Sequence, residues 1–185
     1  MENQLFRNKY RIESIRLSDW DYSSNAAYYI TICTKNRECL FGEICNGQNN
    51  LNRYGKIVFD ELIKTPNIRQ EIILDEFIIM PNHIHVIVII NNVETTGRVV
   101  VETTGRLSLQ QKRNHPNGPG KRSIGSFIAG FKSITTKLIN QIRKMPGTSV
   151  WQENYYESII RNEKQLNIIR EYIINNPLKW GVNPS

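Results

Sequence analysis

The chain has 185 residues, of which 39% are hydrophobic, and a formal net charge of +7 at pH 7. This length is typical of a single domain that can bury a core of its own. Residues 1–22 are charged and lack the apolar segment of a signal peptide, and no apolar run reaches the length of a membrane span. The cysteines Cys33, Cys39 and Cys45 form no CxxC pair, which argues against zinc and redox motifs and indicates a reducing, cytoplasmic compartment.

The positive charge is concentrated in one part of the chain. Residues 103–152 contain nine Lys and Arg residues and no Asp or Glu, whereas the rest of the chain has a net charge of −2. A basic region on a nearly neutral body is typical of proteins that bind nucleic acid. A solvated loop followed by a polar helix face is the alternative explanation. We assign DNA contacts within this region to four cations: Lys121, Arg122, Lys132 and Lys137.

The pattern of apolar residues predicts strands and one helix up to residue 90. Strands are expected at residues 26–34, about 40–45, 71–80 and 83–90, and a helix at 53–64. The helix should end before Pro66, because proline disfavours helical geometry in the residue that precedes it. The turn at Pro81 and Asn82 should join the last two strands into an antiparallel hairpin.

The composition changes between residues 91 and about 121. This segment is rich in Gly, Pro, Asn and charged residues and contains two tandem copies of VETTGR, so we expect an irregular insert. Two copies are too few for a solenoid, and a short hairpin arm is the alternative. His115 lies within this insert and is therefore not counted as a metal ligand.

The last part of the chain is predicted to contain a helix, a strand and a second helix. Apolar residues recur at intervals of three and four between residues 123 and 143, which indicates an amphipathic helix. Residues 149–160 alternate as a strand does, and a helix capped by Asn162 should run to about Asn175 because Pro177 follows. This order of elements predicts a single α/β (α+β) domain over residues 1–185, with a ferredoxin-like antiparallel sheet and helices packed on it.

Two of the three histidines lie one residue apart on a predicted strand. In the stretch FIIMPNHIHVIVII, residues 77–90, His83 and His85 share one face, because successive side chains of a strand point to opposite sides. Both faces are apolar beyond His85, which is typical of a central strand. A rigid strand end that presents two imidazoles is suited to binding a metal ion. The alternative is a pair of histidines whose hydrogen bonds are satisfied at a strand edge.

The last predicted helix contributes a second group of polar residues. Tyr172 and Asn176 are four residues apart and therefore lie on one helix face, beside an apolar stripe that can seat the helix on the core. Taken alone, Tyr172 is more often an ordinary boundary residue. Together with the histidine pair and the basic region, it suits nucleophilic attack by a phenol on a DNA phosphodiester. We expect Mg²⁺ or Mn²⁺, held by His83, His85 and Asn176, to polarise the phosphate and stabilise the leaving oxygen.

Three other aromatic residues offer alternative roles. Tyr155 and Tyr156 are rival nucleophiles, but they precede the last helix and have no amide side chain four residues later. Trp151, or one of these two tyrosines, is a candidate for stacking on DNA bases. A position in the core is at least as common for such aromatic residues.

These motifs, taken in order, carry a family resemblance. MPNHIH, followed by WQENYYESIIRNEKQL and EYIINNPLKW, resembles the single-tyrosine HUH transposases of insertion sequences, and most closely the REP-associated tyrosine transposases. TICTKNRECLFGEI, residues 31–44, is similar to their first-strand region. The resemblance covers residues 26–90 and 123–180. HxH alone is a weak motif, whereas HxH after MPN with the downstream motifs in order is specific.

The resemblance implies a fold of the HUH endonuclease type and a role for each matching residue. His83 and His85 match the metal-binding pair, Tyr172 matches the catalytic tyrosine, and Asn176 matches the polar residue four positions later. Such proteins cut single-stranded DNA near hairpins, leave a 5′-phosphotyrosine link and a free 3′-OH, and need no ATP. The resemblance also implies a bacterial, nucleoid-associated protein that acts on hairpin or palindromic repeat DNA as a monomer or homodimer.

We therefore expect a metal-dependent endonuclease and strand transferase, that is, a transposase. A hairpin-DNA-binding protein with little or no turnover is the alternative, although a pure binder needs neither the histidine pair nor Tyr172. A replication initiator with the same chemistry would need a helicase or origin-binding extension, for which 185 residues leave little room. An unrelated metal hydrolase would not explain the basic region.

Overall fold

The structure is a computed structural model that describes residues 20–92 and 120–180. The VETTGR repeat and His115 lie outside the described residues. The helices and strands, in chain order, are β1 (Ala26–Cys33), β2 (Gly42–Cys45), β3 (Gln48–Leu51), α1 (Arg53–Ile68), β4 (Ile72–Met80), β5 (His83–Ile90), α2 (Ile124–Arg143), β6 (Tyr156–Ile160) and α3 (Glu163–Ile174). Two short 3-10 helices, η1 (Lys35–Arg37) and η2 (Pro177–Lys179), follow β1 and α3. Within the described ranges, no helix is long and apolar enough to cross a membrane.

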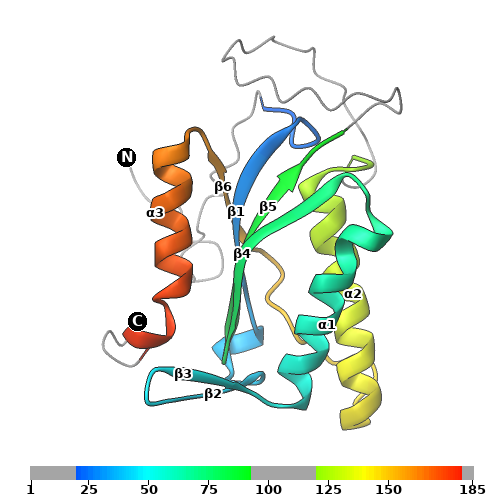
Figure 1. Cartoon of the computed structure of the whole chain (residues 1–185). Coiled ribbons are helices and arrows are strands. Elements are labelled where there is room, and N and C mark those ends of the chain that lie inside the picture. Colours follow the sequence, from blue (N-terminus) through cyan, green and yellow to red (C-terminus); the bar gives the residue numbers. More distant parts are fainter. Residues whose placement is uncertain (1–19, 93–119, 181–185) are drawn as a thin grey trace, which may run out of the picture.

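Four strands form an antiparallel sheet in the order β4-β5-β1-β6. Helices α1 and α2 lie together on one side of this sheet, and α3 lies on the opposite side (Figure 1). If the β2–β3 hairpin is set aside, the order β1-α1-β4-β5-α2-β6 is that of a ferredoxin-like fold, to which α3 is added at the end. The predicted fold class, an antiparallel sheet with helices packed on it, is therefore confirmed.

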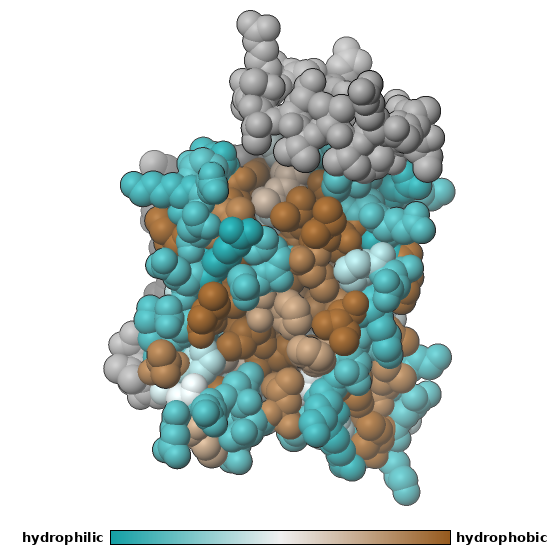
Figure 2. All heavy atoms as spheres, viewed as in Figure 1, coloured by the Kyte–Doolittle hydropathy of each residue, from teal (hydrophilic) through white to brown (hydrophobic). Residues whose placement is uncertain are grey.

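The alternation along β5 divides the core between the two faces of the sheet. Ile84 and Val86 are buried in the larger cluster, which includes residues of α1 and α2. Ile87 packs with Ile160 and Ile173 in a smaller cluster beneath α3. The strand is thus buried on both faces, as its continuous apolar sequence predicts. Figure 2 shows apolar side chains gathered along the sheet between the helices, whose outer surfaces are mostly hydrophilic in this view.

Three elements differ from the sequence predictions. Helix α1 continues through Pro66 to Ile68: the proline lacks the N–H that would donate to the Leu62 carbonyl, but it lies in the last turn, where only two helical residues follow it. The polar strand β3 was not predicted, and it pairs with β2 in a separate two-stranded sheet. Strand β6 is shorter than the predicted 149–160 segment, of which Trp151 makes an isolated bridge with Thr34.

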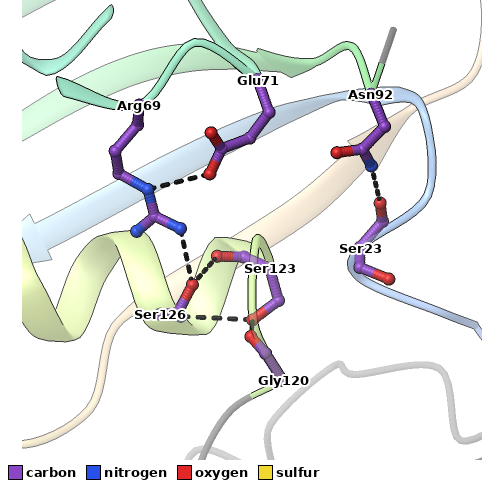
Figure 3. A network of polar contacts seen from close by, with 7 residues as sticks. All are labelled: Ser23, Arg69, Glu71, Asn92, Gly120, Ser123 and Ser126. Atoms are coloured by element: carbon purple, nitrogen blue, oxygen red, sulfur yellow. Dashed lines mark hydrogen bonds and ion pairs between the residues drawn. The ribbon is translucent and has the colours of Figure 1, made fainter. Parts of the chain in front are cut away.

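A polar network lies at the end of the main sheet opposite the β2–β3 hairpin (Figures 1 and 3). Arg69 donates to Glu71 at 3.0 Å and to the Ser126 hydroxyl at 2.7 Å, and so joins the α1–β4 turn to the first turn of α2. Asn92, just beyond β5, donates to the Ser23 carbonyl at 2.6 Å. These contacts tie α2 and the end of β5 to neighbouring parts of the fold, at a distance from the histidine pair.

Candidate active site

The two histidines lie side by side at the start of β5, on the sheet face that α3 covers. The strand register pairs His83 with Cys33 and His85 with Thr31 of β1. The two Nε2 atoms are 3.1 Å apart. The structure therefore brings the predicted pair together at a strand end, as the alternation of side chains requires.

Hydrogen bonds orient the outer nitrogen of each ring. His83 Nδ1 lies 2.6 Å from Asn82 Oδ1, and the Asn82 amide nitrogen donates to a backbone carbonyl at 3.3 Å, so its oxygen accepts from the ring. His83 therefore carries its proton on Nδ1 and a lone pair on Nε2. His85 Nδ1 lies 2.8 Å from the hydroxyl groups of both Tyr29 and Thr31, either of which can accept a proton from it. Such second partners are typical of histidines that bind metal through the other nitrogen.

Burial keeps both imidazoles neutral. It lowers the pKa of His83 to about 4, with a smaller contribution from the positive charge of Arg37. The pKa of His85 is lowered to about 3 by burial and by the neighbouring His83. Neutral imidazole is the form that binds metal ions. At neutral pH, a cation can therefore bind the pair without competing with a positive charge on either ring.

The donor set fits a divalent cation that keeps open positions. Two nitrogens that bind one ion at about 2.1 Å and roughly at right angles are about 3 Å apart, close to the 3.1 Å observed between the Nε2 atoms. Without the ion, a proton on His85 Nε2 makes the same contact a hydrogen bond. Over residues 20–92 and 120–180, no three His, Cys, Asp or Glu side chains gather where they could hold a metal. A third protein ligand would therefore have to be an amide or another oxygen.

Helix α3 places Tyr172 beside the histidine pair. Asn162 caps the helix by accepting from the Gln165 N–H at 2.9 Å, as the capping pattern predicts. The ring centroids of Tyr172 and His85 are 5.3 Å apart, and Tyr172 is 40% exposed. A phenol that contacts the pair and also faces solvent is accessible to an incoming substrate.

Two sets of contacts hold α3 on the sheet of the same chain. Ile173 is buried against Ile87 and Ile160. Arg170 makes two hydrogen bonds to the Asp75 carboxylate, at 2.7 and 2.5 Å, and these bonds lower the pKa of Asp75. Asp75 lies at the register shift in β4, where the β-bulge interrupts the ladder. Tyr172 therefore lies beside the histidine pair of its own chain.

Asn176 lies just beyond the end of α3. Its backbone is still helical, with φ −60° and ψ −42°, so it follows Tyr172 by about one turn, as the spacing predicts. The residue is 8% exposed, and its side-chain amide has no hydrogen-bond partner among the described residues. An amide in this position is available for another ligand. Its role as a metal ligand stays a prediction.

Sequence reasoning missed Tyr29 and Thr31, which support the site from β1. The Tyr29 ring stacks on His85, with centroids 5.5 Å apart, and meets the ring of Tyr172 edge-on at 6.4 Å. Burial raises the pKa of Tyr29. Its neutral hydroxyl therefore acts as a hydrogen-bond partner of His85. The signal that would have found both residues is the β1–β5 register, which cannot be read from either strand alone.

Two cations at the edge of the site were also missed. The guanidinium of Arg37, in η1, is near enough to His83 to help lower the pKa of that ring. Lys179, in η2, places its Nζ 5.8 Å from the centroid of the Tyr172 ring. Both residues come from short segments that follow a predicted element, where no periodic pattern marks them.

The two rival tyrosines lie on opposite faces of the sheet. Tyr156 pairs with Thr31, and its ring is 6.0 Å from that of Tyr29, so it lies on the face of the histidines. Tyr155 packs against the larger core cluster, and the Lys132 Nζ is 5.3 Å from its ring centroid. Of the two, Tyr156 is therefore the closer rival to Tyr172.

Two residues that we expected to contact DNA are engaged within the protein. Trp151 is 3% exposed, packs against Phe41, and donates from Nε1 to the Thr135 hydroxyl at 2.9 Å. The expectation that Trp151 stacks on DNA bases is wrong, because this ring is part of the core. The Lys132 ammonium donates to the carbonyls of residues 152, 153 and 154, at 2.9, 3.1 and 3.4 Å. It supports the loop that precedes β6.

The remaining predicted DNA contacts are exposed but do not form one cluster. Lys121 and Arg122 precede α2, whereas Lys137 lies in its C-terminal half. The thirteen residue steps from Ile124, the first residue of α2, to Lys137 correspond to about 20 Å along the helix axis. The two ends of α2 therefore present separate basic groups, and their contacts with DNA stay predictions.

Comparison with known proteins identifies a relative and a shared fold. No family model matches the chain. A Haemophilus influenzae protein, described as uncharacterized, is 39% identical over 170 residues, which span 90% of this chain and 88% of that protein. The chain belongs to the same family as this protein.

A solved structure with a similar fold is that of a REP-associated tyrosine transposase bound to a REP hairpin. The match has a TM-score of 0.56 and 17% sequence identity, and covers 90% of this chain and 75% of that one. At this level of identity the likeness establishes the fold alone. The sheet and helices described above are thus arranged as in that transposase, in agreement with the predicted fold class.

Proposed function

We propose that the protein is a metal-dependent endonuclease and strand transferase that acts on single-stranded DNA at hairpin or palindromic repeat sequences. The observation that carries this proposal is the contact between a partly exposed phenol and a neutral histidine pair: Tyr172 lies 5.3 Å from His85, ring to ring. The fold shared with a transposase that is bound to a REP hairpin supports the choice of DNA. The ordered sequence motifs support it independently.

In the proposed reaction, the Tyr172 oxygen attacks the phosphorus of a phosphodiester. A bond forms between this oxygen and phosphorus, the bond from phosphorus to the 3′ oxygen breaks, and the phenol proton passes through solvent to that leaving oxygen. The products are a 5′-phosphotyrosine link and a free 3′-OH. One phosphoester bond replaces another, so rejoining needs no ATP. Covalent catalysis of this kind divides one difficult exchange into two easier steps.

His83 and His85 would hold Mg²⁺ or Mn²⁺, with Asn176 as the proposed third ligand. A divalent cation there would polarise the phosphate and offset charge on the leaving oxygen. Burial holds both rings in the neutral form that can bind it. The open coordination positions leave room for phosphate oxygens and water.

The surrounding residues orient the histidines and attract the substrate. Tyr29 and Thr31 bond to His85 Nδ1 and so direct its Nε2 toward the other ring. Arg37 and Lys179 bring positive charge to two sides of the site. In this proposal they contact the phosphates that flank the cleaved one, where fixed positive charge raises the local concentration of DNA.

The first prediction is that Tyr172→Phe abolishes a covalent protein–DNA adduct without abolishing DNA binding. The wild-type protein, incubated with Mg²⁺ and single-stranded hairpin oligonucleotides, should give an adduct that is stable to SDS and attached through a 5′ phosphate. The variant lacks the oxygen that forms this bond, yet it keeps the ring that contacts His85. Gel electrophoresis in SDS measures the adduct, and fluorescence anisotropy measures binding.

Tyr156→Phe and Tyr155→Phe are the matched controls, since each also removes one phenol oxygen and both should still form the adduct. An adduct that persists in Tyr172→Phe and disappears in Tyr156→Phe would move the nucleophile to β6. If the wild type forms no adduct on any hairpin tested, the function is that of a hairpin-DNA-binding protein.

A further inference from the structure

A groove separate from the histidine pair lies between α2, from Ala129 onward, and the loop of residues 144–153. Its volume is about 930 Å³. Four lysines line it, Lys35, Lys132, Lys137 and Lys144, together with a single acidic residue among the described ones, Glu153. The groove lies on the other side of the sheet from the candidate active site, so the chemistry proposed there gives it no role.

The walls of the groove are held in place by buried polar contacts. Asn140, 7% exposed, donates to the Thr148 carbonyl at 2.8 Å and accepts from Arg143 Nε at 2.7 Å. At the other end, Lys132 binds three successive carbonyls of the facing loop, and Glu153 is among the residues so held. Because helix and loop are joined at both ends, the groove exists before any ligand binds.

Three of the four lysines that line the groove have no acidic partner among the described residues. In the part of the chain that the structure describes, the ammonium groups of Lys35, Lys137 and Lys144 make no ion pair and no hydrogen bond. Lys132 is the exception, since its charge is already satisfied by backbone carbonyls. Three unpaired lysines against one glutamate give the groove a positive potential, which favours a ligand with several negative charges.

The groove opens at the same end of the sheet as the histidine pair. The Lys35 N–H donates to the Val150 carbonyl at 2.8 Å, and the Gln152 N–H donates to the Cys33 carbonyl at 2.9 Å, so the loop is joined to the end of β1. Cys33 is also the residue that pairs with His83. The short helix η1 then carries Lys35, which lines the groove, and Arg37, whose charge acts on His83. Lys35 and Arg37 thus place positive charge on η1, one beside the groove and the other near His83.

We propose that this groove binds the phosphodiester backbone of the single-stranded DNA that extends from the cleavage site. The inference rests on the proposed function and adds a second contact region to it. A groove in this size range holds ligands of a few nucleotides rather than a duplex. Basic grooves that follow the backbone are the usual means of holding single strands without sequence preference. The hydroxyl and amide groups of Ser133, Thr136 and Gln141, which also line it, can donate to phosphate oxygens.

The test measures the affinity for single-stranded oligothymidylate as a function of salt, with EDTA present so that no cleavage occurs. For each phosphate contact on a single strand, the slope of log K against log salt is about −0.7. The double variant Lys137→Ala/Lys144→Ala should therefore flatten the slope by about 1.4 and weaken binding roughly tenfold at low salt. Both lysines are exposed on α2 or at its end, so the fold should not change.

The double variant Lys56→Ala/Lys164→Ala is the matched control. It removes the same charge from exposed positions on α1 and α3 and should leave the slope within the error of the wild type. Lysine acetylation with and without oligothymidylate gives an independent readout: Lys35, Lys137 and Lys144 should be protected, and Lys56 should not. A slope that is unchanged in the groove variant, or equally reduced in the control, would overturn the proposal.

Two further probes separate this inference from its alternatives. A blunt DNA duplex should bind the groove variant and the wild type with similar affinity, and an equal loss on duplex would show that the lysines act through net charge alone. Tighter binding to oligouridylate than to oligothymidylate would assign the groove to RNA and overturn the choice of DNA. Because Tyr172→Phe should keep the full salt slope, and the groove variant should still form an adduct at saturating DNA, either hypothesis can fail without the other.

Discussion

At the scale of single residues, the chemistry depends on how His85 is held. Its Nδ1 faces two hydroxyl groups, and its Nε2 faces His83 at 3.1 Å. Rotation of the ring about its side-chain bonds would separate the two Nε2 atoms. The hydroxyls of Tyr29 and Thr31 oppose this rotation, so the geometry that we propose for metal binding is present without an ion.

We therefore predict that the double variant Tyr29→Phe/Thr31→Val binds Mn²⁺ about 10- to 100-fold more weakly than the wild type. Isothermal titration calorimetry measures this affinity directly, without DNA. Tyr156→Phe is the control, because it removes a phenol oxygen from the same sheet face without touching His85 Nδ1. Equal affinities in all three proteins would show that the ring is held by packing alone.

Lys132 shows that a basic residue in the region predicted to bind DNA can have a structural role. Burial lowers its pKa to about 8, yet the three carbonyls that accept from its Nζ favour the charged form. The group is therefore protonated at neutral pH. Its removal leaves three carbonyls of the loop without their donor.

We predict that Lys132→Met lowers the free energy of unfolding by about 1.5 to 3 kcal/mol, which is the range for hydrogen bonds to a charged group. Urea denaturation followed by circular dichroism gives this quantity. Lys137→Met, an exposed position on the same helix, should change it by less than about 0.5 kcal/mol. A comparable loss in both variants would contradict the structural role of Lys132.

At the scale of elements, α3 is the part of the fold whose placement decides whether Tyr172 meets the histidines. Ile173 is its one buried residue, and the partly buried Leu166 and Ile169 pack against the same small core cluster. The paired hydrogen bonds from Arg170 to Asp75 add a directional contact two residues before Tyr172. The helix register is thus set by an apolar stripe and by the polar contact between Arg170 and Asp75.

We predict that Asp75→Asn loosens α3 and slows adduct formation roughly ten- to hundredfold, since small displacements of a nucleophile are costly. Hydrogen exchange should become faster in α3 and remain unchanged in α2. Glu61→Gln, which breaks the 2.8 Å pair with Lys64 on α1, is the control and should change neither.

The contribution of Asp75 to stability also depends on pH. Because the pKa of Asp75 is lowered in the folded protein, the stabilisation that this carboxylate provides is present above the ordinary carboxyl pKa. It is lost as the pH falls through the lowered value.

At the scale of the whole molecule, the histidine pair, of which His85 is buried and His83 half-buried, makes the protein sensitive to acid in the absence of metal. In the unfolded chain both imidazoles take up protons near pH 6.5, whereas in the fold the pKa of His83 is about 4 and that of His85 about 3. Between these values the unfolded state binds more protons, so the free energy of unfolding decreases as the pH falls below about 6.5.

We predict that, in EDTA, this decrease amounts to roughly 3 kcal/mol or more between pH 7 and pH 4, since each unit of pKa difference corresponds to about 1.4 kcal/mol. Chemical denaturation at a series of pH values gives the profile. The double variant His83→Gln/His85→Gln keeps polar side chains of similar length and should have a flatter profile over the same range. Identical profiles would mean that the two rings are not buried as neutral groups.

Much of this arrangement follows from local sequence. The period of two along 83–90 places His83 and His85 on one face, and the positions of Asn162 and Pro177 bound the helix that carries Tyr172. These features were predictable because each depends on neighbouring residues. The failures are also instructive: Pro66 was tolerated in a last helical turn, and Trp151 was buried, because packing overrides local preference.

The sequence by itself determined most of the helices and main-sheet strands, the shared face of the histidines and the four-residue step from Tyr172 to Asn176, since period and capping are local properties. Only the tertiary structure decided which face α3 covers, that Tyr29 supports His85 from 56 positions away, and that Lys132 turns inward while Lys137 lines an open groove. The physical reason is that these outcomes depend on strand register and on which surfaces are buried together. Both are settled by the packing of the whole chain.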